Sequence, residues 1–202
     1  MSLARANQMR EPEFGRHPGP TKILMDRIGA AVLLLLAIPW CVLIVLAIWL
    51  DSVGPVFSRD RRIGQWGVEF DVLRFRSTAS QTPPGGWTPD DPEIQPLSRV
   101  GRFLRRYSMD ELPQLVNVLK GDMSFVGPRP QPPLQGEEGG PDLRRLMLKP
   151  GLTGLWHEDK QSDCAEVEPV DLDRYLQHWS LALDLAILWR SVHGVLRGAG
   201  AH

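Results

Sequence analysis

An uncharged apolar run from Ile28 to Leu50 limits what this chain can fold into more than any other feature of its sequence. At about 1.5 Å per residue, a helix over this run is long enough to cross the ~30 Å hydrocarbon core of a bilayer. The stretch before the run is long and charged, and no small-residue cleavage site follows it, so a removable signal peptide is not expected. The sequence therefore predicts a helix that is held in a membrane.

Pro39 divides this run, and its position bears on how the helix sits in the membrane. A proline inside a helix removes one hydrogen bond and clashes with the preceding turn, so it kinks or breaks the helix. Basic residues flank both ends of the run about equally, whereas a helix that crosses the bilayer usually has its excess of basic residues on the cytoplasmic side. Two topologies follow: an ordinary anchor kinked at Pro39, or a re-entrant helix that bends there and returns to the same face. The residues alone leave both open.

The composition of the 202 residues excludes some classes of protein. A net charge of −1 argues against a general nucleic-acid binder, which is expected to be basic. The two cysteines, Cys41 and Cys164, offer no disulfide framework, and this favours a reducing, cytosolic location for the polar part of the chain. The 19 glycines and 18 prolines predict many turns and extended loops.

Beyond the apolar run, the periodicity first predicts short strands. Gly54–Gly64 and Val68–Arg76 are the expected arms of a hairpin, because the second arm alternates apolar and polar residues and glycines separate the two. The stretch Thr78–Ser98 is rich in proline and is expected to be a long loop.

Short helices are expected in the rest of the chain. Val100–Arg106 is a basic segment of helical character, and Gln114–Lys120 is expected to end at Gly121, a residue that favours helix termination. Apolar residues at helical spacing predict a further helix over Leu172–Leu196. This helix is expected to lie either against the membrane interface or on the protein core, and the pattern does not decide between them.

Asp110 and Glu111 are adjacent carboxylates near the start of the second short helix, and arginines surround them in the sequence. Arg105 and Arg106 precede the pair, and Arg129 follows in a rigid Gly-Pro-Arg-Pro loop. Guanidinium groups match phosphate oxygens and are costly to cluster without anions. The two carboxylates in turn need a compensating cation, and oxygen ligands near phosphates select magnesium. The pattern indicates a site for a metal ion and phosphate groups.

The same carboxylates also have a structural explanation. The segment Ser108–Glu111 fits a capping box, in which a serine and an acidic residue satisfy the first N–H groups of a helix. Acidic residues in the first turn also complement the helix dipole. Spacing alone therefore leaves a capping role open beside the catalytic one.

The chain shares several sequence blocks with a known family, and the blocks occur in the same order. They are the Lys22–Asp26 lead into the apolar run, Gly54–Phe57, Arg61–Gly64, Leu73–Ser77, Val100–Arg106, Asp110–Leu115, Leu119–Ser124, Val126–Pro130 and Lys149–Gly154. Through these blocks the chain resembles the bacterial sugar transferases of the monotopic phosphoglycosyl transferase family. Each block is weak evidence alone, and their order makes the set strong.

The resemblance implies a fold and a location. It implies an α/β (α+β) protein in which a small, mostly helical cytosolic domain with short strands is anchored by a re-entrant membrane helix broken at Pro39. The expected segments are a flexible N-terminal segment (1–21), the re-entrant helix (22–51), a catalytic domain with interfacial helices (52–196) and a tail (197–202). The implied location is the cytoplasmic face of the bacterial inner membrane, with monotopic insertion.

The resemblance also implies an activity, the first step of exopolysaccharide, capsule, O-antigen or glycoconjugate synthesis. Family members transfer a sugar phosphate from a UDP-sugar to polyprenol (undecaprenyl) phosphate, release UMP and require Mg²⁺. By this match, Asp110 is the expected nucleophile, which would form a phosphoglycosyl-aspartyl intermediate, and Glu111 is an expected Mg²⁺ ligand.

Five further residues are expected to contact the substrates. Arg105 and Arg129 match family arginines near the site, and Arg76, Lys120 and Asp122 are secondary candidates. The implied partners are the UDP-sugar, polyprenol phosphate, membrane lipids and downstream glycan-assembly enzymes, without nucleic acid.

One departure from the family pattern concerns the substrate. Many members carry a Gly-Arg pair where this chain has Lys160 and Gln161, so the sequence does not name the sugar. A non-catalytic membrane scaffold of the same fold, or a domain that binds anionic lipids through its arginines, is the alternative to an enzyme. The intact pair of Asp110 and Glu111 favours the enzyme.

Overall fold

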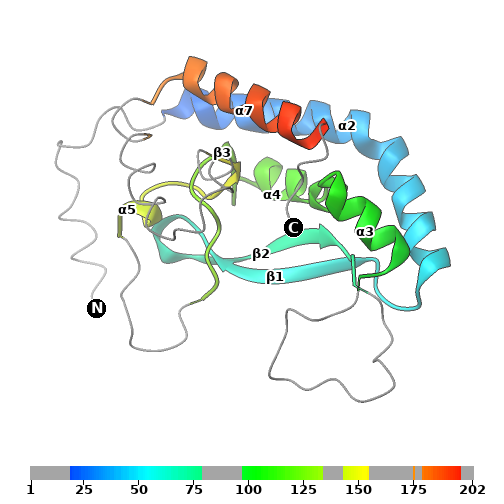
Figure 1. Ribbon diagram of the computed structural model, residues 1–202. Coiled ribbons are helices and arrows are strands. Elements are labelled where there is room, and N and C mark those ends of the chain that lie inside the picture. The colour runs from blue at the N-terminus through cyan, green and yellow to red at the C-terminus, as the bar shows by residue number, and fades with distance from the viewer. Residues whose placement is uncertain (1–18, 79–96, 134–142, 155–174, 176–178, 197–202) are drawn as a thin grey trace.

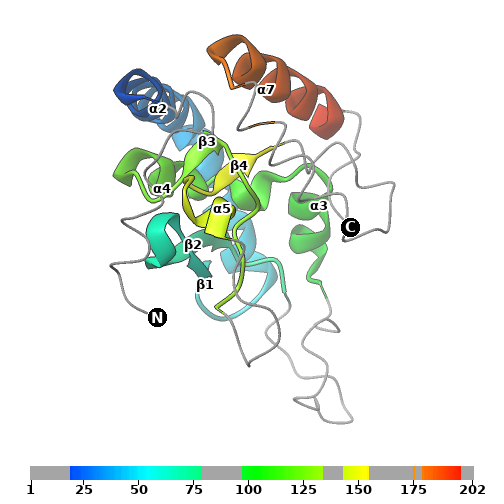
Figure 2. The same ribbon diagram turned by 90° about the vertical axis from the view of Figure 1, so that its left-hand side faces the viewer.

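The computed structural model describes residues 19–78, 97–133, 143–154, 175 and 179–196, and these form a layered α/β structure (Figure 1). The helices are α2 (Pro20–Asp51), α3 (Arg99–Arg106), α4 (Gln114–Lys120), α5 (Leu143–Leu146) and α7 (Leu181–Leu196), with 3₁₀ turns η1 (Gln65–Gly67) and η3 (Met109–Glu111). The strands are β1 (Phe57–Ile63), β2 (Glu69–Phe75), β3 (Ser124–Val126) and β4 (Gly151–Thr153). Helices α2 and α7 together form one face, and the β1–β2 hairpin forms the opposite face (Figures 1 and 2).

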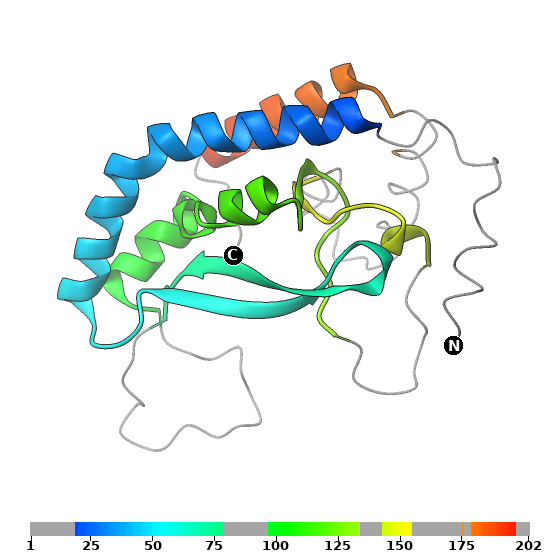
Figure 3. The same cartoon turned by 180° about the vertical axis from the view of Figure 1, so that it is seen from behind.

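Helix α2 contains the whole apolar run and is long and apolar enough to cross a membrane. Only 17% of its most apolar window is buried, whereas the core helix of a soluble protein is mostly buried. The helix is continuous through Pro39, and the expected break at this residue is not confirmed. The ribbon is nevertheless bent, so that its later turns run down the side of the domain towards β1 (Figures 1 and 3).

The domain packs against both ends of α2. Near the N-terminal end, the Lys22 ammonium contacts Asp184 of α7, and the Ser124 hydroxyl donates a hydrogen bond to Asp26. Near the C-terminal end, Ile48 packs in an apolar cluster with residues of β2 and α3. Between them, α2 contacts α4.

The predicted hairpin is confirmed. Strands β1 and β2 pair antiparallel from Phe57↔Phe75 to Ile63↔Glu69, and the two phenylalanine rings stack with centroids 5.3 Å apart. The turn between the strands holds Trp66 in the left-handed region (φ 61°), an unusual conformation for a bulky side chain.

A buried asparagine fixes the hairpin on α4. Asn117 donates from its side-chain amide to the Asp71 carbonyl (2.8 Å) and accepts from the Leu73 N–H (3.1 Å). An edge strand leaves some of its backbone N–H and carbonyl groups without a neighbouring strand to bond. Here one α4 side chain bonds two such groups of β2. Helix α4 ends where predicted, because Gly121 adopts φ 94° and donates to the carbonyls of the last turn.

Strands β3 and β4 form a short parallel pair that the periodicity did not predict. Their backbones approach closely at Gly127 and Gly151, where a Cβ on either residue would meet backbone atoms at 2.3 Å or less. Only glycine fits at these two positions.

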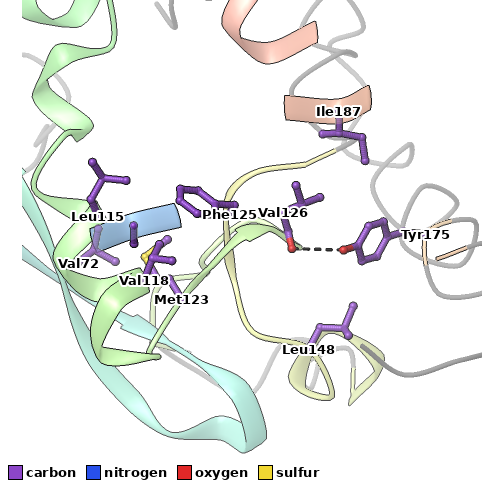
Figure 4. Packing of buried hydrophobic residues seen from close by; sticks show 10 residues of the cluster. Val72, Leu115, Val118, Met123, Phe125, Val126, Leu148, Tyr175 and Ile187 are labelled. Atoms are coloured by element: carbon purple, nitrogen blue, oxygen red, sulfur yellow. Dashed lines mark hydrogen bonds between the residues drawn. The ribbon is translucent and has the colours of Figure 1, made fainter. Parts of the chain in front are cut away.

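The core lies between the β3–β4 pair, β2, α4 and α7. Figure 4 shows its buried side chains, with the Tyr175 hydroxyl donating to the Val126 carbonyl (3.3 Å).

The C-terminal helix begins later than predicted. Trp179 and Ser180 are not helical, and α7 starts at Leu181. The Ser180 hydroxyl accepts a hydrogen bond from the Leu183 N–H (3.1 Å), so it acts as an N-cap and starts a new helix there. Of residues 172–178 of the expected helix, only Tyr175 belongs to the described part of the chain, and it is helical.

Candidate active site

The adjacent carboxylates lie in η3, the short turn that joins α3 to α4. Ser108 precedes the turn in the left-handed region (φ 51°), and its side chain makes no capping hydrogen bond. The Glu111 N–H donates instead to the Ser108 carbonyl (3.3 Å). The capping-box explanation is therefore wrong, because the 3₁₀ turn already uses the N–H group that the serine hydroxyl would have bonded.

The two carboxylates differ in their surroundings. Asp110 is 6% exposed, whereas the side chain of Glu111 is 31% exposed. Burial raises the pKa of the Asp110 carboxyl, and the positive charges of Arg74 and Arg105 oppose that rise. The site thus combines a buried carboxylate flanked by guanidinium groups with a neighbouring carboxylate that reaches solvent.

Arg74 on β2 is a site residue that the sequence reasoning missed. Its Nη2 lies 3.5 Å from Glu111 Oε1, and it is the strongest charge partner of Asp110. Strand periodicity contained the signal, because Val72 and Arg74 lie on the same face of β2 and Val72 packs in the core with residues of α4. Arg74, two positions after Val72, therefore has to lie on the same face of β2, towards the segment before α4.

Arg105 lies where the sequence predicted, beside the carboxylates. Its Nε donates to the Ser77 hydroxyl (3.0 Å), and its charge acts on Asp110. Arg76 is placed differently, because its guanidinium donates to the carbonyls of Ser52 (2.8 Å) and Val53 (3.0 Å) just after α2. These contacts give Arg76 a structural task at the end of α2.

The remaining predicted substrate residues lie away from Asp110. Lys120 and Asp122 are at the opposite end of α4, which is about 10 Å long at ~1.5 Å per residue. Arg129 lines a small cavity with Ile63 and Gly64 near the turn of the hairpin. That end of the hairpin is about 17 Å from Arg74, at ~3.3 Å per strand residue. Lys160 and Gln161 lie outside the described residues.

The donor set at this site suits magnesium only in part. Within the described residues, no cluster of three or more carboxylate, histidine or cysteine side chains comes together. Magnesium at phosphoryl-transfer sites is commonly held by one or two carboxylates, with water and substrate phosphates as the other ligands. Glu111, with its solvent-exposed oxygen atoms, and the adjacent Asp110 fit that arrangement when a substrate supplies the remaining oxygens.

Comparison with known proteins shows which family this chain belongs to. The family model described as bacterial sugar transferase matches residues 18–198. The chain is 35% identical to an undecaprenyl-phosphate galactose phosphotransferase of Salmonella typhimurium over 90% of its own length. It is 37% identical, over the same share of its length, to a UDP-glucose:undecaprenyl-phosphate glucose-1-phosphate transferase of Caulobacter vibrioides. It is 33% identical, over 91% of its length, to the exopolysaccharide production protein ExoY of Rhizobium meliloti.

The relatives differ in how much longer they are than this chain. The matched region covers 41% of the Salmonella protein, 72% of the Caulobacter protein and 89% of the Rhizobium protein. The family model, in contrast, extends over nearly all of the chain and includes α2, the carboxylate turn and α7. This chain belongs to the bacterial sugar transferase family.

Proposed function

We propose that this protein transfers a sugar phosphate from a UDP-sugar to undecaprenyl phosphate or a similar polyprenol phosphate, and so begins the synthesis of a lipid-linked glycan. The observation that carries the proposal is the buried carboxylate of Asp110 beside Glu111, faced by Arg74 and Arg105. Membership of the family and the names of the relatives support the same activity.

Asp110 is the proposed nucleophile. One of its oxygens attacks the phosphorus that carries the sugar, a new O–P bond forms, and the bond from that phosphorus to UMP breaks. An oxygen of the polyprenol phosphate then attacks the same phosphorus, which forms the lipid-linked product and returns Asp110 as a carboxylate. Two half-reactions let a soluble donor and a membrane-bound acceptor use one nucleophile in turn.

The neighbouring groups make this attack possible. A carboxylate and a pyrophosphate repel each other, so catalysis depends on cations and on fixed geometry. Arg105 is held by its bond to Ser77 and supplies one such charge beside Asp110. Magnesium, bound by Glu111 and substrate oxygens, would neutralise charge on the phosphates and the leaving UMP.

We also propose a monotopic topology on the cytoplasmic face of the inner membrane, and the contacts of α2 support the placement of both its ends on one side. Lys22 near the start of the helix contacts Asp184, and Asp51 at its end accepts a hydrogen bond from the Val100 N–H (3.2 Å). Both ends of α2 therefore contact the same polar domain, and a helix that crossed the bilayer would place them on opposite sides. This arrangement favours the re-entrant helix over the ordinary anchor.

The activity is tested with purified protein, a panel of UDP-sugars that starts with UDP-galactose and UDP-glucose, and undecaprenyl phosphate. We expect UMP release that depends on magnesium and, for sustained turnover, on the polyprenol phosphate. Without acceptor, the protein should gain the mass of one sugar phosphate on a peptide that contains Asp110. Asp110→Asn should abolish both signals, whereas Asp71→Asn, an exposed acid on β2, should leave them unchanged.

The same assay separates the proposal from its alternatives. A scaffold or a lipid-binding domain would release no UMP with any donor. An adduct on Glu111, or normal turnover by Asp110→Asn, would contradict the assignment of the nucleophile.

Topology is tested with single cysteines near residues 10 and 60, in a variant that lacks Cys41 and Cys164. Both sites should resist a membrane-impermeant thiol reagent added outside intact cells and react after lysis. Labelling of only the site near residue 10 in intact cells would show that α2 crosses the bilayer.

A further inference from the structure

Arg74 contacts the site in a way that the proposed mechanism does not yet use. Its Nη2 lies against Glu111 Oε1 at 3.5 Å, and the same guanidinium acts on the buried carboxylate of Asp110. Its Nε is buried and has no hydrogen-bond partner among the described residues. One arginine therefore faces both carboxylates.

The fold places Arg74 there rigidly. Asn117 of α4 bonds the backbone of Asp71 and Leu73, so the register of β2 against α4 is fixed just before Arg74. Val72, on the same face of β2, is almost fully buried in the core. The Arg74 side chain is 39% exposed, so its charge is not deeply buried. The backbone next to Arg74 is therefore fixed by Asn117, and the Arg74 side chain reaches the carboxylate turn.

We propose that Arg74 is a positioning residue for the carboxylate pair: it pairs with Glu111 beside the buried Asp110, and it competes with a divalent cation for Glu111. This proposal rests on the proposed function, because it takes Glu111 as the cation ligand. A cation on Glu111 would lie within a few ångströms of the guanidinium and be repelled by it. At separations of this size the repulsion between two charges is on the order of one to a few kcal/mol. Arg74 would therefore weaken cation binding and at the same time orient Asp110.

This dual role predicts opposite effects on two measurements. Removing the positive charge should tighten cation binding, because Glu111 loses the guanidinium at 3.5 Å that would repel the cation. Removing the same side chain should slow turnover, because Asp110 loses the strongest of its charge partners. A residue that only stabilised the fold would not tighten cation binding.

The experiment measures Mn²⁺ binding to the full chain in detergent micelles, from the electron paramagnetic resonance signal of free Mn²⁺. Turnover with UDP-sugar and undecaprenyl phosphate is measured on the same samples. For Arg74→Gln, we expect the dissociation constant for Mn²⁺ to fall about tenfold, given the charge repulsion above, and turnover to fall at least about tenfold. For Arg74→Lys, which keeps the charge but not the planar fork, affinity should stay near that of the wild type while turnover falls.

Two controls make the result decisive. Arg61→Gln removes an arginine on the same hairpin, where it pairs with Glu69 at the surface, and should change neither quantity more than twofold. Glu111→Gln should weaken Mn²⁺ binding.

The possible failures are distinguishable. Unchanged Mn²⁺ affinity in Arg74→Gln, with Glu111→Gln weakened, would overturn the role of Arg74 and leave the proposed function intact. Unchanged affinity in Glu111→Gln would overturn both this proposal and the proposed cation ligand. If Arg74→Gln does not fold, then full turnover by Arg74→Lys, or a change in its affinity, would be enough to reject the proposal.

Discussion

The two ends of α2 pack against the same domain through different kinds of interaction, polar at one end and apolar at the other. At the N-terminal end the contacts are polar and buried: Lys22 Nζ lies 2.5 Å from Asp184 Oδ2, and the Ser124 hydroxyl donates to Asp26 (2.7 Å). At the C-terminal end the contacts are mainly apolar, and Ile48 packs against Phe75 and Leu104.

The difference shows how one helix can be held firmly in a set position. Apolar packing is strong but not directional, so it tolerates small shifts along the helix. A buried ion pair is costly to desolvate and stable only with good geometry and extra hydrogen bonds. Asp184 meets this condition by also accepting bonds from Tyr175 (2.8 Å) and Trp179 (3.3 Å). We infer that the apolar end contributes most of the attachment and that the polar end sets its register.

The largest effect is expected when one partner of the polar end is removed. Asp184→Leu should lower the free energy of unfolding by about 3–5 kcal/mol, because the buried ammonium of Lys22 loses its nearest carboxylate and keeps only Asp26, at 4.0 Å. Adding Lys22→Met should recover at least half of that loss, since an apolar pair of similar volume needs no desolvation. Thermal and chemical unfolding in detergent measures both. A double variant as unstable as the single one would mean that the ion pair itself is not what holds this end.

The second-largest effect is expected when the apolar packing at the C-terminal end of α2 is reduced. Leu104→Ala should cost about 2–5 kcal/mol through lost burial and a residual cavity, measured by the same unfolding transitions. The matched control is Leu119→Ala, because Leu119 on α4 is 40% exposed, whereas Leu104 is 1% exposed. Equal losses for the two variants would argue against tight packing at this end of α2.

A smaller effect is expected at Arg76, which joins the end of α2 to β2. Arg76→Ala removes bonds to two carbonyls and the Ser52 hydroxyl and should cost about 1.5–3 kcal/mol of stability. Because these contacts point to α2, we expect the KM for the UDP-sugar to stay within about twofold of the wild-type value. Arg59→Ala, at an exposed position on β1, serves as the control. A large rise in KM with unchanged stability would instead show that Arg76 binds the substrate.

The smallest effect concerns Tyr175, which supports the polar end. Tyr175→Phe should cost about 0.5–1.5 kcal/mol at neutral pH through the lost bond to Asp184. Burial and the negative charge of Asp184 hold the pKa of Tyr175 far above its ordinary value of 10.0. The unfolded chain therefore loses this proton first, so the contribution is complete below pH 10 and decreases as the pH rises above that value. The difference between wild type and variant should shrink in unfolding curves recorded above pH 10; a constant difference would place the hydroxyl in solvent.

The sequence by itself determined the elements that local patterns encode. The apolar run, the alternating hairpin arms and the helix that ends at Gly121 follow from periods and turn residues a few positions apart. The pair Asp110 and Glu111 was also evident, because its residues are adjacent and the sequence blocks around it are specific.

Only the tertiary structure decided which distant side chains meet. Arg74 on β2 and Arg76 just after the strand lie two positions apart, yet Arg74 faces Glu111 and Arg76 binds the end of α2. Sequence alone did not separate their roles, because the partners come from α2 and η3, far along the chain in opposite directions. The parallel pairing of β3 with β4 and the contact of Lys22 with Asp184 were hidden for the same reason. Local periodicity carries no information about the partner across such distances, and it is the packing of whole elements that selects it.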